Sequence, residues 1–83
     1  MVTYGPQTIG TSAVLIFAPN SNRVVSRFSH VSGSTLYVGY DNGVTPENGE
    51  PVESGGTFDA ERYDGPVWGV CASGSAEIRK VER

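Results

Sequence analysis

A disulfide needs two cysteines, and this chain of 83 residues has only one, Cys71. We therefore expect no covalent staple within the chain and folding in a reducing compartment. A domain of this size hides only about 60% of the surface that its unfolded chain exposes. Its stability should be modest, or supplemented by contacts with neighbouring molecules.

Basic residues are also few, because 6 Lys and Arg stand against 9 Asp and Glu, which gives a net charge of −3. The densest basic stretch contains Arg79, Lys80 and Arg83, and it is interrupted by Glu77 and Glu82. Binding to a nucleic-acid backbone requires a larger uninterrupted basic patch. The sequence therefore predicts no nucleic-acid partner.

Long apolar runs are absent as well. The longest, "AVLIFA", is far shorter than the stretch of about 20 residues that a membrane-spanning helix needs. The opening "MVTYGPQTIG" has no basic segment followed by an apolar run, which is the pattern of a secretory signal. We expect neither export by a standard signal nor a membrane partner.

What the chain does have is turn residues, with 11 glycines and 5 prolines, and apolar residues that alternate with polar ones between the turns. Turns recur at intervals of roughly 8 to 12 residues, as in sandwiches and small barrels. The pattern predicts an all-β fold, a small antiparallel β-sandwich or barrel of about six to seven short strands. We expect a single β domain over residues 8–83, preceded by an N-terminal arm at residues 1–7 that docks on a partner.

The expected strands follow the apolar runs. Residues 8–19 are expected to form one strand, and the last two strands are expected to pair as a hairpin across Ser73-Gly74-Ser75. The other expected strands cover residues 23–31, 34–40 and 49–53 and a segment through Phe58.

Alternation also predicts which side chains face inward. We expect Phe28 to face the core, Leu36, Val38 and Tyr40 to share one face, and Tyr37 to face outward. Gly39, inside a strand, predicts a bulge or a close backbone approach.

The aromatic residues could form a platform for sugars or protein surfaces. In so small a domain, however, we expect Trp68 to be needed in the core, and Tyr37 is the better surface candidate.

The oxygen-rich corner at residues 41–50 could bind a metal, but its spacing matches no EF-hand loop, and turn formation is favoured.

A catalytic pair of Cys71 and His30 would need a third residue to orient the histidine, and none can be identified from the sequence. Cys71 stands in an apolar strand without a nearby Lys or Arg, so we expect a packed, unreactive thiol.

Catalysis by two carboxylates requires that the pKa of one be raised above that of the other. The sequence shows no partner residue that would do this for Asp59, Glu61 or Asp64. No phosphate-binding glycine motif occurs. The sequence therefore predicts no catalytic residue, no metal site and no cofactor.

Two long stretches resemble a family of small virion proteins of tailed bacteriophages. They are "IGTSAVLIFAPNSNRVVSRFSHVSGSTLYVGYDNGVTPENGEPVESGGTF" and "YDGPVWGVCASGSAEIRKVE", which follow that family's order of strands, Ser/Gly turns and Asn-Gly…Pro corner. The chain departs from the pattern at Ser26, where relatives have an aliphatic residue, and at Cys71, where a small one is usual. The resemblance implies a compact β-sandwich or barrel attached to the virion, without catalytic activity.

On this basis we expect a non-enzymatic virion structural protein, above all a capsid decoration protein bound to the outer capsid surface after assembly in the host cytoplasm. Its partner would be the major capsid protein or another virion protein, with homo-oligomers possible. Two alternatives stay open: a minor structural protein of the head–tail junction or tail, and a module that binds carbohydrate or a host surface. The candidate interface residues are Val2, Tyr4, Tyr37, Asn42, Val44, Pro46 and Pro51.

Overall fold

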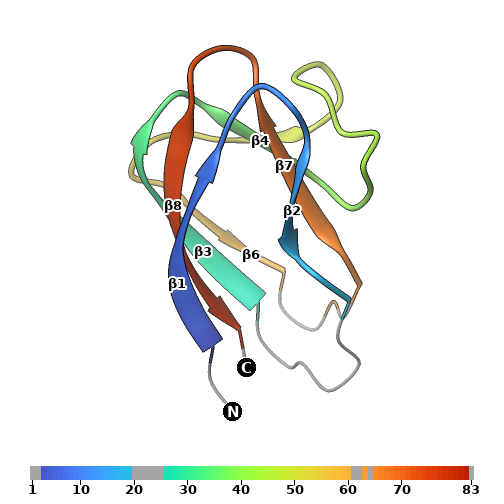
Figure 1. The fold of residues 1–83 in the computed structure, drawn as a ribbon, viewed down its shortest axis with the longest axis vertical. Helices are drawn as coiled ribbons and strands as arrows, with labels where there is room; N and C mark the ends of the chain where they lie inside the picture. Colours follow the sequence, from blue (N-terminus) through green and yellow to red (C-terminus); the bar gives the residue numbers. More distant parts are fainter. Residues whose placement is uncertain (1–2, 20–25, 61–62, 64, 83) are drawn as a thin grey trace.

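The fold is all-β, as expected, and the part of the chain that the structure describes contains eight strands rather than six or seven (Figure 1). The computed structural model describes residues 3–19, 26–60, 63 and 65–82. Its strands are β1 (Thr3–Ile9), β2 (Val14–Phe17), β3 (Ser26–Gly33), β4 (Leu36–Gly39), β5 (Glu50–Val52), β6 (Thr57–Asp59), β7 (Val67–Cys71) and β8 (Ala76–Glu82).

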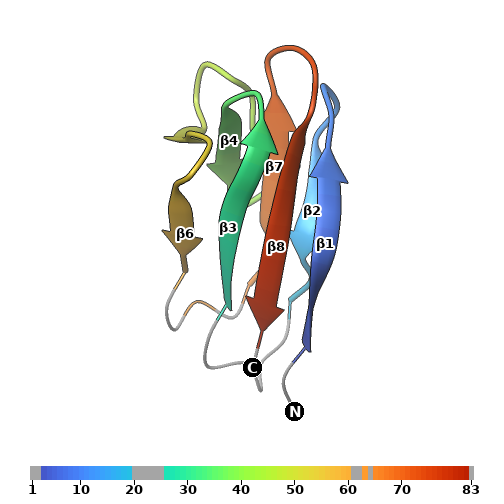
Figure 2. The ribbon, with the colours of Figure 1, turned by 90° about the vertical axis from the view of Figure 1, so that its left-hand side faces the viewer.

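The strands form two antiparallel sheets of four, which lie face to face as two layers (Figure 2). Sheet A has the order β1-β8-β3-β6, and sheet B has the order β2-β7-β4-β5. The architecture is therefore a sandwich rather than a barrel. Because each sheet is hydrophobic on the side that meets the other, the core lies between the two layers.

Only β4 and β5 are neighbours both in sequence and in a sheet, because every other connection passes from one sheet to the other. Eight strands in this order form a jelly roll. The expected hairpin between the last two strands is therefore wrong: β7 belongs to sheet B and β8 to sheet A. The Ser-Gly-Ser turn reverses the chain with Gly74 at φ 65°, but such a turn does not determine which sheet the next strand joins.

The expected N-terminal arm is corrected for residues 3–7, which belong to β1. This strand pairs with β8 from Thr3 opposite Glu82 to Ile9 opposite Ala76. Pro6 is tolerated because β1 is an edge strand and one of its sides has no ladder to complete. The packed domain therefore includes residues 3–7, which Gly5 and Pro6 had led us to expect as part of an arm.

The single strand expected at residues 8–19 is two strands, β1 and β2, which lie in different sheets. A register shift between Leu15 and Phe17 interrupts the pairing of β2 with β7. It allows two consecutive side chains, Ile16 and Phe17, to be buried, while Leu15 is 38% exposed. The apolar run is thus covered on one side only.

The core is built from the inward side chains of both sheets. Phe28 of β3 stacks on Phe58 of β6 with ring centroids 5.3 Å apart, so the expected facing of Phe28 is confirmed. The other members of the core are Ile9, Ile16, Phe17, Leu36, Val38, Val52, Val67, Cys71, Ala76 and Ile78. Tyr40, expected beside Leu36 and Val38, lies past the end of β4 and is exposed.

Trp68 is not part of this core, contrary to expectation. In β7 the inward positions are Val67, Gly69 and Cys71, and Trp68 is half-buried on the other side of the sheet. The inward position beside it has no room for a side chain, since a Cβ on Gly69 would lie 2.7 Å from Cδ1 of Ile16. The alternation of the strand, rather than the size of the indole, determines where Trp68 lies.

Candidate interaction surface

The outward sides of the two sheets differ in chemistry. Sheet A presents mainly exposed polar and charged side chains, namely Arg27, Ser29, Thr57, Asp59, Glu77 and Arg79, together with the exposed Val31 and Pro6. Sheet B presents a set that we call the apolar face: Leu15, Pro51, Tyr37, Trp68 and Val70. A side of a sheet that is apolar although it faces away from the core is a candidate for contact with another molecule.

The residues of the apolar face lie next to one another across all four strands. Leu15 of β2 is opposite Trp68 of β7, and Tyr37 of β4 is opposite both Val70 of β7 and Pro51 of β5. Directly opposed residues of antiparallel strands lie close together on one side of the sheet. Val70 is only 4% exposed, so the accessible part of the face comes from Leu15, Pro51, Tyr37 and Trp68.

The loop of residues 40–49 is anchored at one end of this face. Val44 lies against Gly39, where an added Cβ would come within 2.7 Å of the Cβ of Val44. A close approach is observed at Gly39, but the partner is the side chain of Val44 rather than a backbone segment, and β4 has no bulge in its pairing. Gly49 lies equally close to Tyr37, since its Cβ would be 2.9 Å from the Cβ of Tyr37.

Side-chain hydrogen bonds hold the shape of this loop. Asp41 Oδ1 accepts from the Gly43 backbone N at 2.8 Å, and Asn48 Oδ1 accepts from the Thr45 N at 2.7 Å. These are turn-forming bonds of the kind that Asp and Asn make locally. The corner residues therefore have a structural role, as the sequence pattern favoured.

The candidate interface residues of this loop differ in accessibility. Asn42 is exposed and Pro46 is half-buried, but Val44 is 7% exposed and is covered by the contacts with Gly39. Of the remaining candidates, Tyr4 lies in β1 opposite Val81, and Val2 falls outside the described residues. The structure brings Tyr37 and Pro51 together on the apolar face and places Tyr4 in the other sheet.

A pocket lies where β4 ends and the loop begins, and we call it the β4-end pocket. Tyr40 beside it is 55% exposed, and its ring meets that of Tyr63 edge-on at 4.8 Å and 68°. The lining residues are Val38, Gly39, Tyr40, Asp41, Gly43, Val44, Asn48 and Glu50. Of these residues, Gly39 is opposite Trp68 of the apolar face, and Val44 packs against Gly39.

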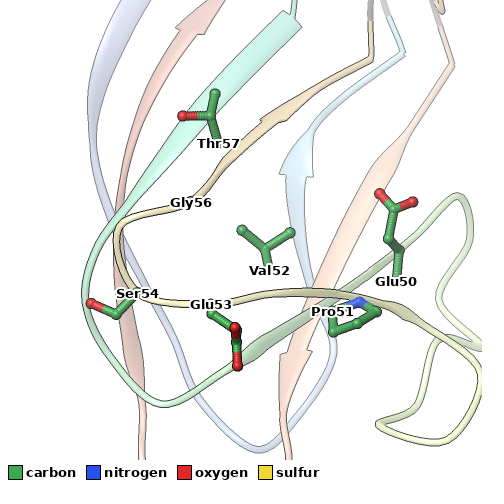
Figure 3. Close-up of a pocket in the computed structure, with 7 residues that line it drawn as sticks. All are labelled: Glu50, Pro51, Val52, Glu53, Ser54, Gly56 and Thr57. Atoms are coloured by element: carbon green, nitrogen blue, oxygen red, sulfur yellow. The ribbon is translucent and has the colours of Figure 1, made fainter.

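A second, shallow pocket lies at the turn from β5 to β6, where the chain passes from sheet B to sheet A (Figure 3). Figure 3 shows Glu50 and Val52 on one side of the β5 backbone and Pro51 and Glu53 on the other. The turn is closed by a bond from the Gly56 N to the Glu53 O at 2.8 Å, with Gly55 at φ 90°. Its carboxylates add negative charge to this edge of the molecule.

His30 and Cys71 each have a backbone partner of their own. The His30 Nε2 lies 2.6 Å from the Ser34 O in a side chain that is 1% exposed. The Cys71 thiol donates to the Ile9 O at 3.5 Å, and burial raises the pKa of that thiol. Both residues therefore have roles in packing and turn formation.

The remaining titratable candidates form no site in the part of the chain that is described. Asp59 is exposed on the outer side of β6, while Glu61 and Asp64 fall outside the described residues. Among residues 3–19, 26–60, 63 and 65–82, no three His, Cys, Asp or Glu side chains are placed to hold a metal ion. The same residues include no helix that could cross a membrane.

Sequence reasoning missed three members of the apolar face: Leu15, Trp68 and Val70. Two features of the sequence pointed to them. Alternation along "VWGVC" puts Trp68 and Val70 on the same side of the strand, and β2 has four consecutive apolar residues, which cannot all face the core of a strand that is covered on one side only.

Comparison of the chain with protein-family models, with curated proteins and with solved structures found no match.

Proposed function

We propose that the chain is a non-enzymatic structural protein of a tailed-phage virion, bound to the outer capsid surface as a decoration protein. The observation that carries the proposal is the apolar face, which spans the four strands of sheet B, while the described side chains on the opposite outer side are mainly polar and charged, with Val31 and Pro6 as exposed apolar exceptions. This asymmetry supports attachment through one side of the sandwich. It leaves the polar side of sheet A for solvent.

Two further observations support the proposal. The sequence resembles small virion proteins over nearly its whole length, and the jelly roll recurs in viral capsid domains. That fold also occurs in lectins, so it supports the proposal by analogy only. The argument for binding to a partner therefore depends on the apolar face rather than on the fold.

The composition of the apolar face suits a protein partner. Tyr37 and Trp68 belong to residue types that are enriched in interfaces, where large, stiff side chains provide most of the binding free energy. Leu15 and Pro51 extend the contact toward both edges of sheet B. Since a capsid repeats its subunits, the same contact would be available at every equivalent position, and many copies could bind one particle.

The experiment adds the purified chain to phage particles that lack it and measures co-sedimentation and the temperature at which the particles rupture. We expect saturable binding and a higher rupture temperature. Leu15→Lys should weaken binding because it places a charge on the apolar face, at a position that is already partly exposed. The matched control, Ser29→Lys on the outer side of sheet A, should bind as the wild type does.

Absence of binding to such particles rejects the decoration role. Saturable binding to sugars on a glycan array, lost on Tyr37→Ala, would replace it with a carbohydrate-binding function. Binding to isolated tails or necks instead of capsids would keep the structural role and move it to the head–tail junction.

A further inference from the structure

The loop of residues 40–49 contains two Asn-Gly pairs, Asn42-Gly43 and Asn48-Gly49. It extends beyond the two sheets at one side of the molecule (Figure 1), and both asparagines are exposed. In an Asn-Gly pair the backbone N of the glycine reaches the asparagine side-chain amide with little hindrance, because glycine has no Cβ. The sequence alone therefore makes both pairs candidates for chemical modification, and the structure separates them.

The Asn48-Gly49 pair is held at both of its reacting groups. Asn48 Oδ1 accepts from the Thr45 N at 2.7 Å, and Asn48 Nδ2 donates to the Gly43 O at 3.3 Å. The Gly49 N donates to the Thr45 O at 2.9 Å, and a Cβ added to Gly49 would lie 2.8 Å from Cγ2 of Val44. Attack of the Gly49 N on the Asn48 amide carbon would have to break all three bonds in a crowded place.

The Asn42-Gly43 pair is held much less. Within the described residues no hydrogen bond involves the Asn42 side chain. The Gly43 N donates to Asp41 Oδ1 at 2.8 Å, an exposed bond that water can replace at little net cost. That carboxylate oxygen is also the only atom within 4 Å of a Cβ added to Gly43. Rotation of one side chain and loss of one surface bond therefore free the Gly43 N and the Asn42 amide to meet.

We propose that Asn42 is a site of spontaneous deamidation and that Asn48 is protected from it. Hydroxide removes the proton from the Gly43 N, and this nitrogen forms a bond to Cγ of Asn42. The bond from Cγ to Nδ2 then breaks, and the nitrogen leaves as ammonia after taking a proton from water. Water opens the resulting cyclic imide at one of its two carbonyls, which gives aspartate or isoaspartate in place of Asn42.

The modification changes both the charge and the backbone of the loop. Asp41 and Glu47 already make it acidic, and the product adds a further carboxylate. Isoaspartate also adds one carbon atom to the backbone, within the turn from Asp41 to Val44 whose closing bond is 3.4 Å long. Because this turn brings Val44 against Gly39, we expect the isoaspartate form to lose that contact.

The experiment incubates the folded chain at mildly alkaline pH and then digests it with a protease that cleaves after glutamate. Cleavage after Glu47 places the two Asn-Gly pairs on different peptides, in which mass spectrometry measures the conversion of amide to carboxylate. Since three bonds hold the Asn48 pair against one for the Asn42 pair, we expect Asn42 to react at least about tenfold faster. In urea, which removes these bonds, the two asparagines should react at similar rates.

Gly43→Ala tests the chemical route. Gly43 does not have the left-handed backbone that alanine avoids, so the turn can be kept, while the new Cβ hinders attack by the backbone N. We expect Asn42 to react several-fold more slowly in this variant. Gly10→Ala is the matched control, because nothing lies within 4 Å of its added Cβ, and it should react at the wild-type rate.

Equal rates for the two asparagines in the folded chain would overturn the proposal, as would an unchanged rate in Gly43→Ala. Asn42 that stays intact in the folded chain while both pairs react in urea would overturn it as well. Wild-type amide shifts at Gly39 and Val44 in the purified isoaspartate form would reject the effect on the loop. The proposal does not depend on the docking function, since none of these measurements involves particles.

Discussion

The side chain of His30 in β3 donates from Nε2 to the backbone O of Ser34 at 2.6 Å and so closes the β3–β4 turn. A carbonyl can only accept, so Nε2 carries a proton, and Nδ1 is buried without a partner in the described part of the chain. The backbone of His30 also donates to the Gly56 O and accepts from the Gly55 N. One buried residue therefore joins two turns that connect the sheets.

We expect His30→Ala to lower the free energy of unfolding by about 2–4 kcal/mol, because it opens a cavity and leaves the Ser34 O without its donor. Urea unfolding followed by tryptophan fluorescence measures the change. Ser29→Ala, at the exposed neighbouring position, should change stability by no more than about 0.5 kcal/mol. Equal effects of the two substitutions would contradict the role given to His30.

Gly39→Ala tests how the loop is attached to the apolar face. The new Cβ would overlap Val44, so the loop must shift, and we expect a loss of about 1–3 kcal/mol together with changed amide shifts over residues 41–49. Gly10→Ala is the control, because no atom lies within 4 Å of its added Cβ. If Gly39→Ala is as stable as Gly10→Ala, the loop is not seated as described.

The sequence predicted the fold class and much of the strand pattern because alternation and turn residues act locally. Phe28 inside, Tyr37 outside and the tight spot at Gly39 all followed from parity and composition. The assignment of strands to sheets did not follow, since a Ser-Gly-Ser turn fits both a hairpin and a crossing between sheets. Trp68 was predicted to lie in the core because its side chain is large, but its position in the alternation of β7 puts it on the outer side of sheet B.

The candidate site was predicted only in part for the same reason. Tyr37 and Pro51 were named as contacts, but their neighbours Leu15, Trp68 and Val70 come from β2 and β7, which only the tertiary pairing brings beside β4. Val44 was chosen as an apolar residue in a loop, and the loop folds back to bury it. Contacts between distant segments decide the first outcome, and contacts of the β4–β5 loop with Gly39 and Gly49 decide the second.

Cys71 should make stability fall at alkaline pH. Burial raises the pKa of its thiol in the folded state, so above the ordinary thiol pKa the unfolded chain releases this proton more readily than the folded one. The stabilising difference is present at neutral pH and is lost as pH rises through that ordinary value toward the raised one. We expect unfolding free energies, measured from about pH 7 to pH 10, to fall more steeply for the wild type than for Cys71→Ala.

The same burial should protect the thiol from reagents. At about pH 8 we expect labelling by a thiol-reactive disulfide to be slow in the native chain and rapid in denaturant, because the thiolate is the attacking species. Rapid native labelling, or identical pH slopes for wild type and Cys71→Ala, would contradict the packed position of Cys71 beside Ile9.

Lys80 provides the last test, because it links the two sheets from within. It lies in β8 opposite Phe28, and its Nζ donates to the Ile16 O of β2 at 2.9 Å and lies 5.7 Å from the centroid of the Phe17 ring. Lys80→Met retains an apolar stem but removes the donor and the charge, and we expect a loss of about 1–3 kcal/mol in urea unfolding. Arg79→Met is the matched control, since the neighbouring side chain points to solvent, and it should cost no more than about 0.5 kcal/mol. Equal stability of the two variants would show that the bond to Ile16 adds nothing to the closure of the sandwich.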